Sequence, residues 1–410
     1  MEIMIKLAVI LFLFLQTTRQ EGCTITLFQT WDSVVISSES FEILYPPVEN
    51  APDDRNITLP VGATIIISCN GGHFSGSFET TKTILATCNQ DFRLEVQDTI
   101  LDYDKLDCVN FKSQIAKTTS TSCGPNAIII EVGFQIGLNI RFLPQMVVCF
   151  DTKNQIPLYT QYNMTKSIGF IKSYLQTTYV TDAVFNPDID FDAMYNFTHE
   201  QQEINKLLGL PADSTKYVAP LSCRPPGGAQ TPGFCFTPRQ LTDRGSFVYI
   251  PQQQATFRYI NVAPQWYFLD YNLNKLERNV VDYVKTNKLD LEVYTGTFGV
   301  ASYPHEITGE DVALFMYVSG SDKAVPVPLI FWKLVYDAVG QRATVFLTVD
   351  DPYQTDVSKN VICDDVSDGI GWLTWEKHNV TKGYSYACAY EDAKKTISYL
   401  PDIIVKEILV

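Results

Sequence analysis

Two acidic residues and several basic residues lie near one another in the C-terminal half of the sequence. Asp270 and Glu277 stand at the start of a segment with helical periodicity, and carboxylate oxygens suit a hard cation such as Mg²⁺ or Mn²⁺. The basic residues around them are Arg239, Arg244, Arg258, Lys275 and Arg278. These cations suit contact with phosphate groups, although ordinary surface charge would give the same pattern. Residue types and spacing alone thus leave two interpretations open, a site that contacts phosphate and ordinary surface charge.

Hydrophobic periodicity indicates the elements that would position these residues. A helix is predicted over residues 272–286, because Leu276, Val280 and Val284 recur at four-residue steps. Further helices are predicted over residues 200–210 and 391–400. Strands are predicted over residues 246–250, 291–300, 312–318, 329–336 and 343–349. We expect residues 221–410 to form an α+β domain with a mixed sheet.

The N-terminal part of the chain is predicted to be β-rich. Residues 63–69, 126–132 and 146–150 are runs of β-branched residues bounded by glycine, proline or asparagine, a pattern typical of strands. A chain of 410 residues is longer than one hydrophobic core usually serves. We therefore predict a disulfide-bonded β-rich domain over residues 21–150, a transition over 151–220 and the α+β domain over 221–410.

The start of the chain and its cysteines indicate export. Lys6 and an apolar run from Leu7 to Leu15 are typical of a signal peptide, here residues 1–20, and the run is shorter than the ~20 residues that span a bilayer. The ten cysteines all follow this segment and suit an oxidising compartment. Proximity predicts the pairs Cys223–Cys235 and Cys363–Cys388. We expect a secreted, extracellular protein without a membrane span.

Four Asn-x-Thr sequences become glycosylation sites if the chain is exported. They begin at Asn56, Asn163, Asn196 and Asn379. Each motif is short and arises often by chance, so its meaning depends on the signal peptide. Exported, the chain is predicted to be a glycoprotein with these sites at its surface.

Several segments of the C-terminal half resemble the DNA/RNA non-specific endonucleases, a family of ββα-metal nucleases. The resemblance is closest to secreted arthropod members that digest double-stranded RNA and DNA. It rests on the order and spacing of the segments, since each of them alone is weak evidence. They are Ala255–Trp266 (ATFRYINVAPQW), Leu276–Glu277, Leu291–Val300 (LEVYTGTFGV), Val327–Asp337 (VPLIFWKLVYD), Trp372–Trp375 (WLTW) and Gly383–Cys388 (GYSYAC). The resemblance implies a ββα-metal nuclease-like domain.

The resemblance also implies where catalytic groups should lie. The family has an Arg-Gly-His motif before the first of these segments, and its histidine is the general base that deprotonates the attacking water. Ungapped alignment places Pro238, Arg239 and Gln240 there, while Asp243-Arg244-Gly245-Ser246 imitates the motif in a second register. Neither register contains a histidine. The four histidines are His73, His199, His305 and His378.

The implied metal site has two possible registers. Counting forward from Gln265 places the family's Mg²⁺-binding asparagine at Asp270, whereas counting back from Glu277 places it at Leu269. Asp270 can bind a hard cation and Leu269 cannot. The nucleic-acid contacts are predicted to come from Arg239, Arg244, Arg258 and Arg278, with Asp270 and Glu277 as metal ligands.

These residues predict a family member with weak or no activity. Glutamine has no nitrogen that takes up a proton near neutral pH, and loss of a general base costs about 10²–10⁴ in rate. The net charge of −15 also opposes polyanions at long range. The alternatives are a non-catalytic protein that binds DNA or RNA and a secreted module that contacts other proteins.

Overall fold

The computed structural model describes residues 22–27, 33–51, 53–69, 72–109, 114–137, 141–172, 178–219, 234–354 and 356–410. The chain forms two compact units, Met1–Lys112 with Ile136–Ile140, and Ser113–Gln135 with Arg141–Val410. The predicted signal peptide, residues 1–20, lies outside the described residues. None of the helices in the described part combines the length and apolar character that a bilayer crossing requires.

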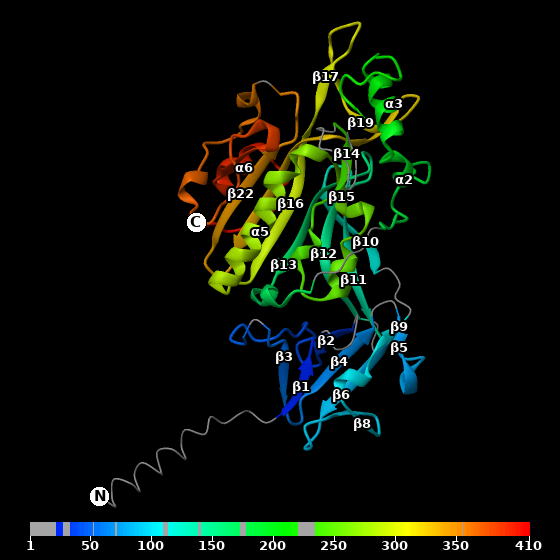
Figure 1. Ribbon diagram of the computed structural model, residues 1–410, viewed down its shortest axis with the longest axis vertical. Helices are drawn as coiled ribbons and strands as arrows, with labels where there is room; N and C mark the ends of the chain where they lie inside the picture. Colours follow the sequence, from blue (N-terminus) through cyan, green and yellow to red (C-terminus); the bar gives the residue numbers. More distant parts are fainter. Residues whose placement is uncertain are drawn as a thin grey trace, which may run out of the picture. The chain divides into compact units, whose positions relative to one another are not determined.

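The first unit consists of short strands in three sheets (Figure 1). A five-stranded sheet has the order β2-β4-β6-β7-β8, and the pairs β1–β3 and β5–β9 accompany it. The strands are β1 (Gly22–Thr26), β2 (Ser33–Ser37), β3 (Asn56–Pro60), β4 (Thr64–Cys69), β5 (His73–Phe74), β6 (Thr83–Cys88), β7 (Leu94–Val96), β8 (Thr99–Leu101) and β9 (Cys108–Val109). Ile36 and Ile67 are fully buried in this unit. The β-rich N-terminal region predicted from the sequence is present.

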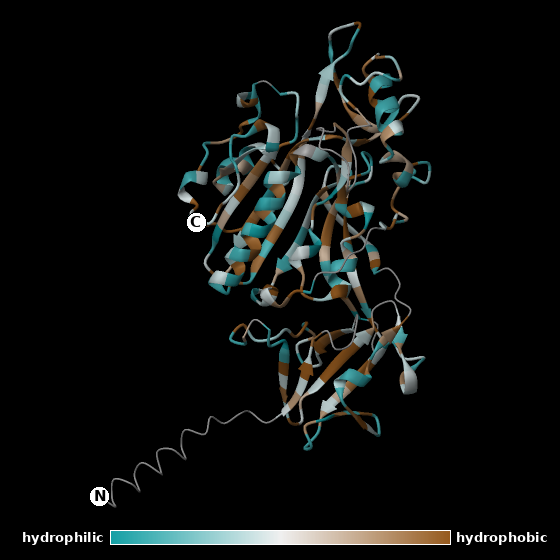
Figure 2. Ribbon diagram, in the orientation of Figure 1, coloured by the Kyte–Doolittle hydropathy of each residue, from teal (hydrophilic) through white to brown (hydrophobic). Residues whose placement is uncertain are grey.

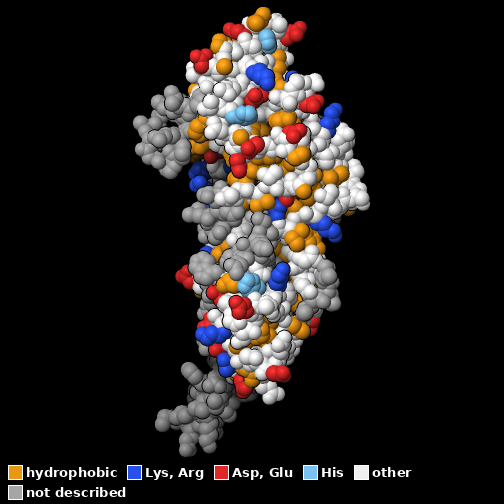
Figure 3. Space-filling view, turned by 90° about the vertical axis from the view of Figure 1, so that its right-hand side faces the viewer, with side chains coloured by type: hydrophobic (Ala, Val, Ile, Leu, Met, Phe, Trp, Pro, Cys, Tyr) orange, Lys and Arg blue, Asp and Glu red, His pale blue; other side chains and the backbone are white. Residues whose placement is uncertain are grey.

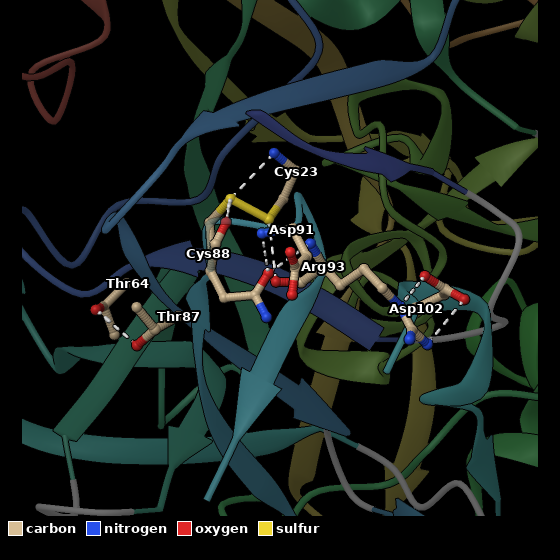
Figure 4. The surroundings of a disulfide bond; sticks show 8 residues. Cys23, Thr64, Thr87, Cys88, Asp91, Arg93 and Asp102 are labelled. Carbon is tan, nitrogen blue, oxygen red and sulfur yellow. Dashed lines mark hydrogen bonds and ion pairs between the residues drawn. A yellow bond between two sulfur atoms is a disulfide. The ribbon is translucent and has the colours of Figure 1, made fainter. Parts of the chain in front are cut away.

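Each of the two units contains disulfides between its own cysteines. They include Cys23–Cys88, Cys69–Cys108, Cys123–Cys149 and the predicted Cys363–Cys388. Around the first of these, Thr64 and Thr87 are hydrogen-bonded across β4 and β6, and Arg93 pairs with Asp102 (Figure 4). Cys235 is also disulfide-bonded, and its predicted partner Cys223 lies outside the described residues.

A nine-stranded sheet forms the centre of the second unit. Its order is β10-β11-β12-β13-β16-β21-β22-β23, and β24 pairs in parallel with β22. The strands are β10 (Ile115–Gly124), β11 (Ala127–Ile136), β12 (Arg141–Asp151), β13 (Ile156–Met164), β16 (Leu291–Val300), β21 (Pro328–Asp337), β22 (Arg342–Val349), β23 (Tyr384–Cys388) and β24 (Glu407–Ile408). Strands β10, β11 and β12 lie almost entirely within residues 21–150, the stretch predicted to form the N-terminal domain, and β13 follows directly. All four strands belong to the large sheet of the second unit. The fold is α+β with a mixed sheet, as predicted.

Smaller elements surround the sheet. The helices are α2 (Phe191–Met194), α3 (Phe197–Leu207), α4 (Ile250–Ala255), α5 (Asp270–Asn287) and α6 (Tyr390–Thr396), and the remaining strands are β14 (Phe236–Gln240), β15 (Val262–Trp266), β17 (Ser302–Pro304), β18 (Asp311–Ala313), β19 (Phe315–Ser319) and β20 (Asp322–Pro326). The strand predicted over 246–250 is wrong, because Pro251 occupies the first turn of α4 and Tyr249 caps it. Proline at this position suits a helix start and cannot donate to a sheet.

Strands β14 and β15 and helix α5 together make the ββα unit that positions the candidate site. The two strands pair antiparallel, with Gln240 opposite Val262. Helix α5 lies across the large sheet (Figure 1), and Leu273 on α5 packs with Phe331 on β21. The outward face of α5 is hydrophilic (Figure 2), as expected for an amphipathic helix that covers a sheet. The periodicity of residues 272–286 thus predicted both the helix and its buried face.

Candidate functional site

A pocket of about 190 Å³ opens between β14, the start of α5 and the loop after β14. It brings together three of the predicted site residues, Arg239, Gln240 and Asp270. Its lining consists of Tyr179, Thr237, Pro238, Arg239, Gln240, Asp243, Gln265 and Asp270. Because β14 ends at Gln240 and α5 begins at Asp270, the ββα unit holds these side chains on rigid elements.

Gln240, predicted from the sequence to stand at the position of the family's general base, is held in place by hydrogen bonds. Its Nε2 donates to the carbonyl oxygen of Thr256 at 3.0 Å and to the Thr256 hydroxyl at 3.1 Å. An amide nitrogen that donates in this way has no lone pair to accept a proton from water. Gln240 therefore supports the strand connection and supplies no general base.

All four histidines lie in the described part of the chain, and none of them lines the pocket. His199 is on α3, and His305 follows β17. His378 stacks on Tyr384 with ring centres 5.1 Å apart and lies 3.3 Å from Asp365. His73 belongs to the first unit. No histidine from elsewhere in the sequence replaces the missing base.

Glu277 is buried between two cations. Its Oε1 lies 3.2 Å from Nζ of Lys333 on β21 and 3.5 Å from Nη2 of Arg239 on β14. Lys333 also donates to the Thr295 hydroxyl at 2.6 Å. Burial raises the pKa of Glu277, and Lys333 is the strongest influence in the opposite direction. The carboxylate predicted as a metal ligand is thus neutralised by side chains of the protein itself.

Asp270 is the first residue of α5 and faces the pocket. Its Oδ2 accepts a hydrogen bond of 2.9 Å from Nδ2 of Asn274. Burial raises the pKa of Asp270, and the charge of Arg239 opposes that shift. Leu269, the residue in the other sequence register, is buried at 1% exposure and does not line the pocket. Of the two registers, only the Asp270 register places a possible ligand at the site.

The predicted phosphate-binding arginines are spread over different environments. Arg239 lines the pocket, and Arg244 follows Asp243, which also lines it. Arg278 is exposed on α5. Arg258 is 4% exposed and forms an ion pair with Asp182, so the structure does not bring it to the pocket. Arg258 thus differs from the other three arginines in being buried in the interior, and its position in the sequence did not reveal this.

Several residues in or beside the pocket were not predicted from the sequence to be functional. Gln265 is 1% exposed and lines the pocket, and its amide nitrogen and oxygen have no hydrogen-bond partner among the described residues. Asp350, at the end of β22, is fully buried, and its Oδ2 accepts from the backbone N–H of Trp266 at 3.2 Å. Burial raises the pKa of Asp350 well above its usual value. Tyr179 comes from the predicted transition segment. Only the fold brings these residues together.

The sequons differ in accessibility. Asn163 and Asn196 are exposed, whereas Asn56 and Asn379 are half-buried. The Asn56 side chain accepts from the Thr26 hydroxyl at 2.6 Å, and the Asn379 amide donates to Glu376 at 3.1 Å. Asn163 and Asn196 are therefore the most accessible of the four asparagines to modification.

Glu200 anchors β14 from a neighbouring helix. This residue of α3 is 1% exposed, and its Oε2 accepts from the backbone N–H of Phe236, the first residue of β14, at 3.0 Å. Burial raises the pKa of Glu200 to about 8, and the hydrogen bond from Phe236 opposes this shift only in part. The start of the strand that carries Arg239 and Gln240 therefore depends on a carboxyl group that is protonated at neutral pH.

Replacement of Glu200 by glutamine is expected to make stability less dependent on pH. Between about pH 4.5 and 8 the folded protein holds a proton on Glu200 that the unfolded chain has released. As the pH rises through this range, the free energy of unfolding of the natural protein therefore falls by up to about 1.4 kcal/mol per pH unit. Glutamine keeps the acceptor for Phe236 without titrating. Denaturant unfolding at pH 5 and pH 8 measures the difference. The exposed Glu310→Gln variant is the control, and an equal pH dependence in both variants would contradict the assignment.

A ββα unit that presents a polar pocket between its first strand and the start of its helix is the arrangement of a ββα-metal nuclease fold. The sequence model of the DNA/RNA non-specific endonucleases matches residues 125–393. The chain therefore belongs to the DNA/RNA non-specific endonuclease family. The match begins at residue 125, so it includes strands β11–β13 as well as the segment after residue 221.

Salivary proteins of insects are similar to this chain. A salivary endonuclease of Lutzomyia longipalpis is 26% identical over 323 residues, covering 78% of this chain and 69% of that protein. Salivary protein Tsal2A of Glossina morsitans morsitans is 26% identical over 372 residues and covers 87% of each chain. A chain of the solved EndoG/EndoGI complex has 16% identity and covers 67% of this chain and 92% of its own length. Its TM-score of 0.35 is too low to carry a structural argument.

The family depends on a divalent metal, generally Mg²⁺, and the residues of this site do not fit one as they are arranged. Glu277 already faces a guanidinium and an ammonium group. In the described residues, no group of three or more histidine, cysteine, aspartate or glutamate side chains is arranged to hold a metal ion. A divalent cation beside Glu277 would be repelled by both positive side chains. Asp270 and Glu277 as metal ligands therefore remain a prediction from sequence.

Proposed function

We propose that this protein is secreted and binds DNA or RNA through the ββα site, with hydrolysis at most near background. The observation that carries the proposal is Gln240, an amide hydrogen-bonded to Thr256 at the position of the general base. Family membership and the name of the Lutzomyia relative support nucleic acid as the ligand class. The disulfides and the salivary relatives support an extracellular location.

Contacts with nucleic acid are expected to be few and local. Basic and acidic side chains are interspersed on the face shown in Figure 3, which agrees with a net charge of −15. Near the site, Tyr271 is 36% exposed at the start of α5, and Lys382 lies 4.2 Å from its ring centre. An exposed aromatic ring beside basic side chains suits stacking of a base next to a phosphate contact. Arg239, Arg244 and Arg278 would supply the phosphate contacts.

The proposal predicts salt-sensitive binding without cleavage. Fluorescence anisotropy with labelled double-stranded RNA and DNA should show log Kd changing with log salt by about 0.9 for each phosphate contacted, hence a slope near 3 for three arginines. The labelled strands should remain intact with Mg²⁺, with Mn²⁺ and with chelator. Arg93→Gln, in the first unit, is the control for general loss of charge.

Two results would refute the proposal. Cleavage by the natural chain that chelator stops would show that another group acts as the base. Absence of binding at low salt would instead favour the module that contacts other proteins.

A further inference from the structure

The Arg239 side chain connects β14 to α5 inside the site. Its Nη1 donates to Oδ1 of Asn274 at 2.5 Å, and its Nη2 lies 3.5 Å from Oε1 of Glu277. Only 12% of the side chain is exposed. The guanidinium is therefore fixed against two side chains on the same face of α5, one turn apart, and the exposed part of Arg239 lines the pocket.

Removal of this guanidinium would change the charge of the site. Asp243 and Asp270 line the pocket, and Glu277 lies in contact with the two cations Arg239 and Lys333. Asp243 is close enough to contribute to the raised pKa of Glu277, and Arg239 acts on the pKa of both Asp270 and Glu277. Without Arg239, Glu277 would keep Lys333 as its counter-charge, and Asp270 would lose the cation that lowers its pKa.

The pocket also contains an unused oxygen. The Gln265 side chain is 1% exposed, and neither its amide oxygen nor its nitrogen has a hydrogen-bond partner in the part of the chain that the structure describes. One carboxylate oxygen of Glu277, Oε2, is likewise buried without a partner there. Amide and carboxylate oxygens are the ligands that Mg²⁺ and Mn²⁺ prefer. Oxygen ligands are therefore present around the pocket, and Arg239 lies among them.

We propose that Arg239 is a built-in cation that takes the place of a divalent metal and keeps a latent metal site at Asp270 and Glu277 closed. Ungapped alignment places the glycine of the family's Arg-Gly-His motif at this position, and glycine has no side chain that could reach α5. The binding surface of the natural protein would therefore need no metal. This proposal concerns the same site as the proposed function, but its test needs no nucleic acid, so either can fail while the other stands.

Binding of Mn²⁺, followed by the loss of the electron paramagnetic resonance signal of the free ion, tests the proposal directly. The natural protein should leave Mn²⁺ free, whereas Arg239→Gly should bind one Mn²⁺ per chain at least about tenfold more tightly. Arg239→Lys, which keeps a cation, should behave as the natural protein does. Arg239→Gly combined with Asp270→Leu should lose the acquired Mn²⁺.

Further variants and measurements verify that each protein is folded, so that a change in Mn²⁺ binding does not reflect a loss of folding. Lys333 still neutralises Glu277 in the Arg239→Gly variant, so we expect it to fold, and Arg239→Gln provides a second neutral replacement if glycine weakens β14. Circular dichroism and thermal unfolding verify that each variant is folded. The proposal is overturned if the natural protein binds Mn²⁺ as tightly as folded Arg239→Gly and Arg239→Gln do. It is also overturned if Arg239→Lys binds Mn²⁺ as tightly as these two neutral variants.

Discussion

Rebuilding the Arg-Gly-His motif in this chain is expected to raise metal-dependent cleavage of nucleic acid by about 10²–10⁴-fold over the natural protein. The variant combines Pro238→Arg, Arg239→Gly and Gln240→His. The new histidine stands at the end of β14, where Gln240 lines the pocket, and can accept the proton of the attacking water. The glycine removes the guanidinium from Glu277, and the new arginine supplies a phosphate contact. Incubation with plasmid DNA and long double-stranded RNA, with Mg²⁺ and with chelator, measures the gain.

Intermediate variants show which change matters. Gln240→His alone should remain near background, because Arg239 still lies against Glu277 and a base without a metal leaves the charge of the phosphate unbalanced. Gln240→His with Arg239→Gly should recover most of the activity. Gln254→His, on α4 and outside the pocket lining, is the control for a histidine added nearby. A folded triple variant that binds Mn²⁺ and still does not cleave would show that more than the motif has been lost.

Local patterns in the sequence were sufficient for much of the fold. Strand β16 has the predicted bounds 291–300, and α5 extends the predicted helix by only a few residues at its ends. Both segments contain a clear alternation or a four-residue repeat of apolar side chains, and tertiary packing reinforces that pattern. The segment 246–250 failed because its apolar residues resemble a strand, although Pro251 favours the first turn of a helix. Here the backbone preference of one residue outweighed the β propensity of its neighbours.

The sequence indicated two of the side chains that line the pocket but not the electrostatics around them. Resemblance to the family predicted roles for Gln240, Asp270 and Glu277, and Gln240 and Asp270 line one pocket, whereas the roles themselves stay predictions. Lys333 reaches Glu277 from a distant strand, and its position among apolar residues of β21 indicated only a buried segment. Arg258 was grouped with the phosphate contacts by its position in sequence, yet Asp182 pairs with it in the interior. Such pairings depend on tertiary contacts that have no periodic signature.

Replacement of Glu277 by glutamine is expected to lower the free energy of unfolding by about 3–5 kcal/mol, because it leaves buried cations without a counter-charge. Lys333 is 1% exposed, and its remaining hydrogen bonds within the described residues are to Thr295 and Tyr162. Chemical denaturation at neutral pH, followed by fluorescence or circular dichroism, measures the loss. Asp282→Asn on the same helix removes an exposed ion pair with Lys285 and should change stability by less than about 1 kcal/mol.

The pH dependence and a second substitution identify Lys333 as the source of the loss. Burial lowers the pKa of Lys333 and Glu277 opposes that shift, so the pKa should fall further in Glu277→Gln. The unfolded chain then binds more protons than the folded one over the range between the lowered pKa and about 10.4, and stability should recover as the pH rises through that range. Adding Lys333→Met should restore part of the stability at neutral pH, because it removes the stranded charge. A Glu277→Gln variant as stable as Asp282→Asn would show that Lys333 and Arg239 do not depend on this carboxylate. The latent metal site would then lose its main structural argument, since the pairing of Glu277 with protein cations is what keeps a metal out.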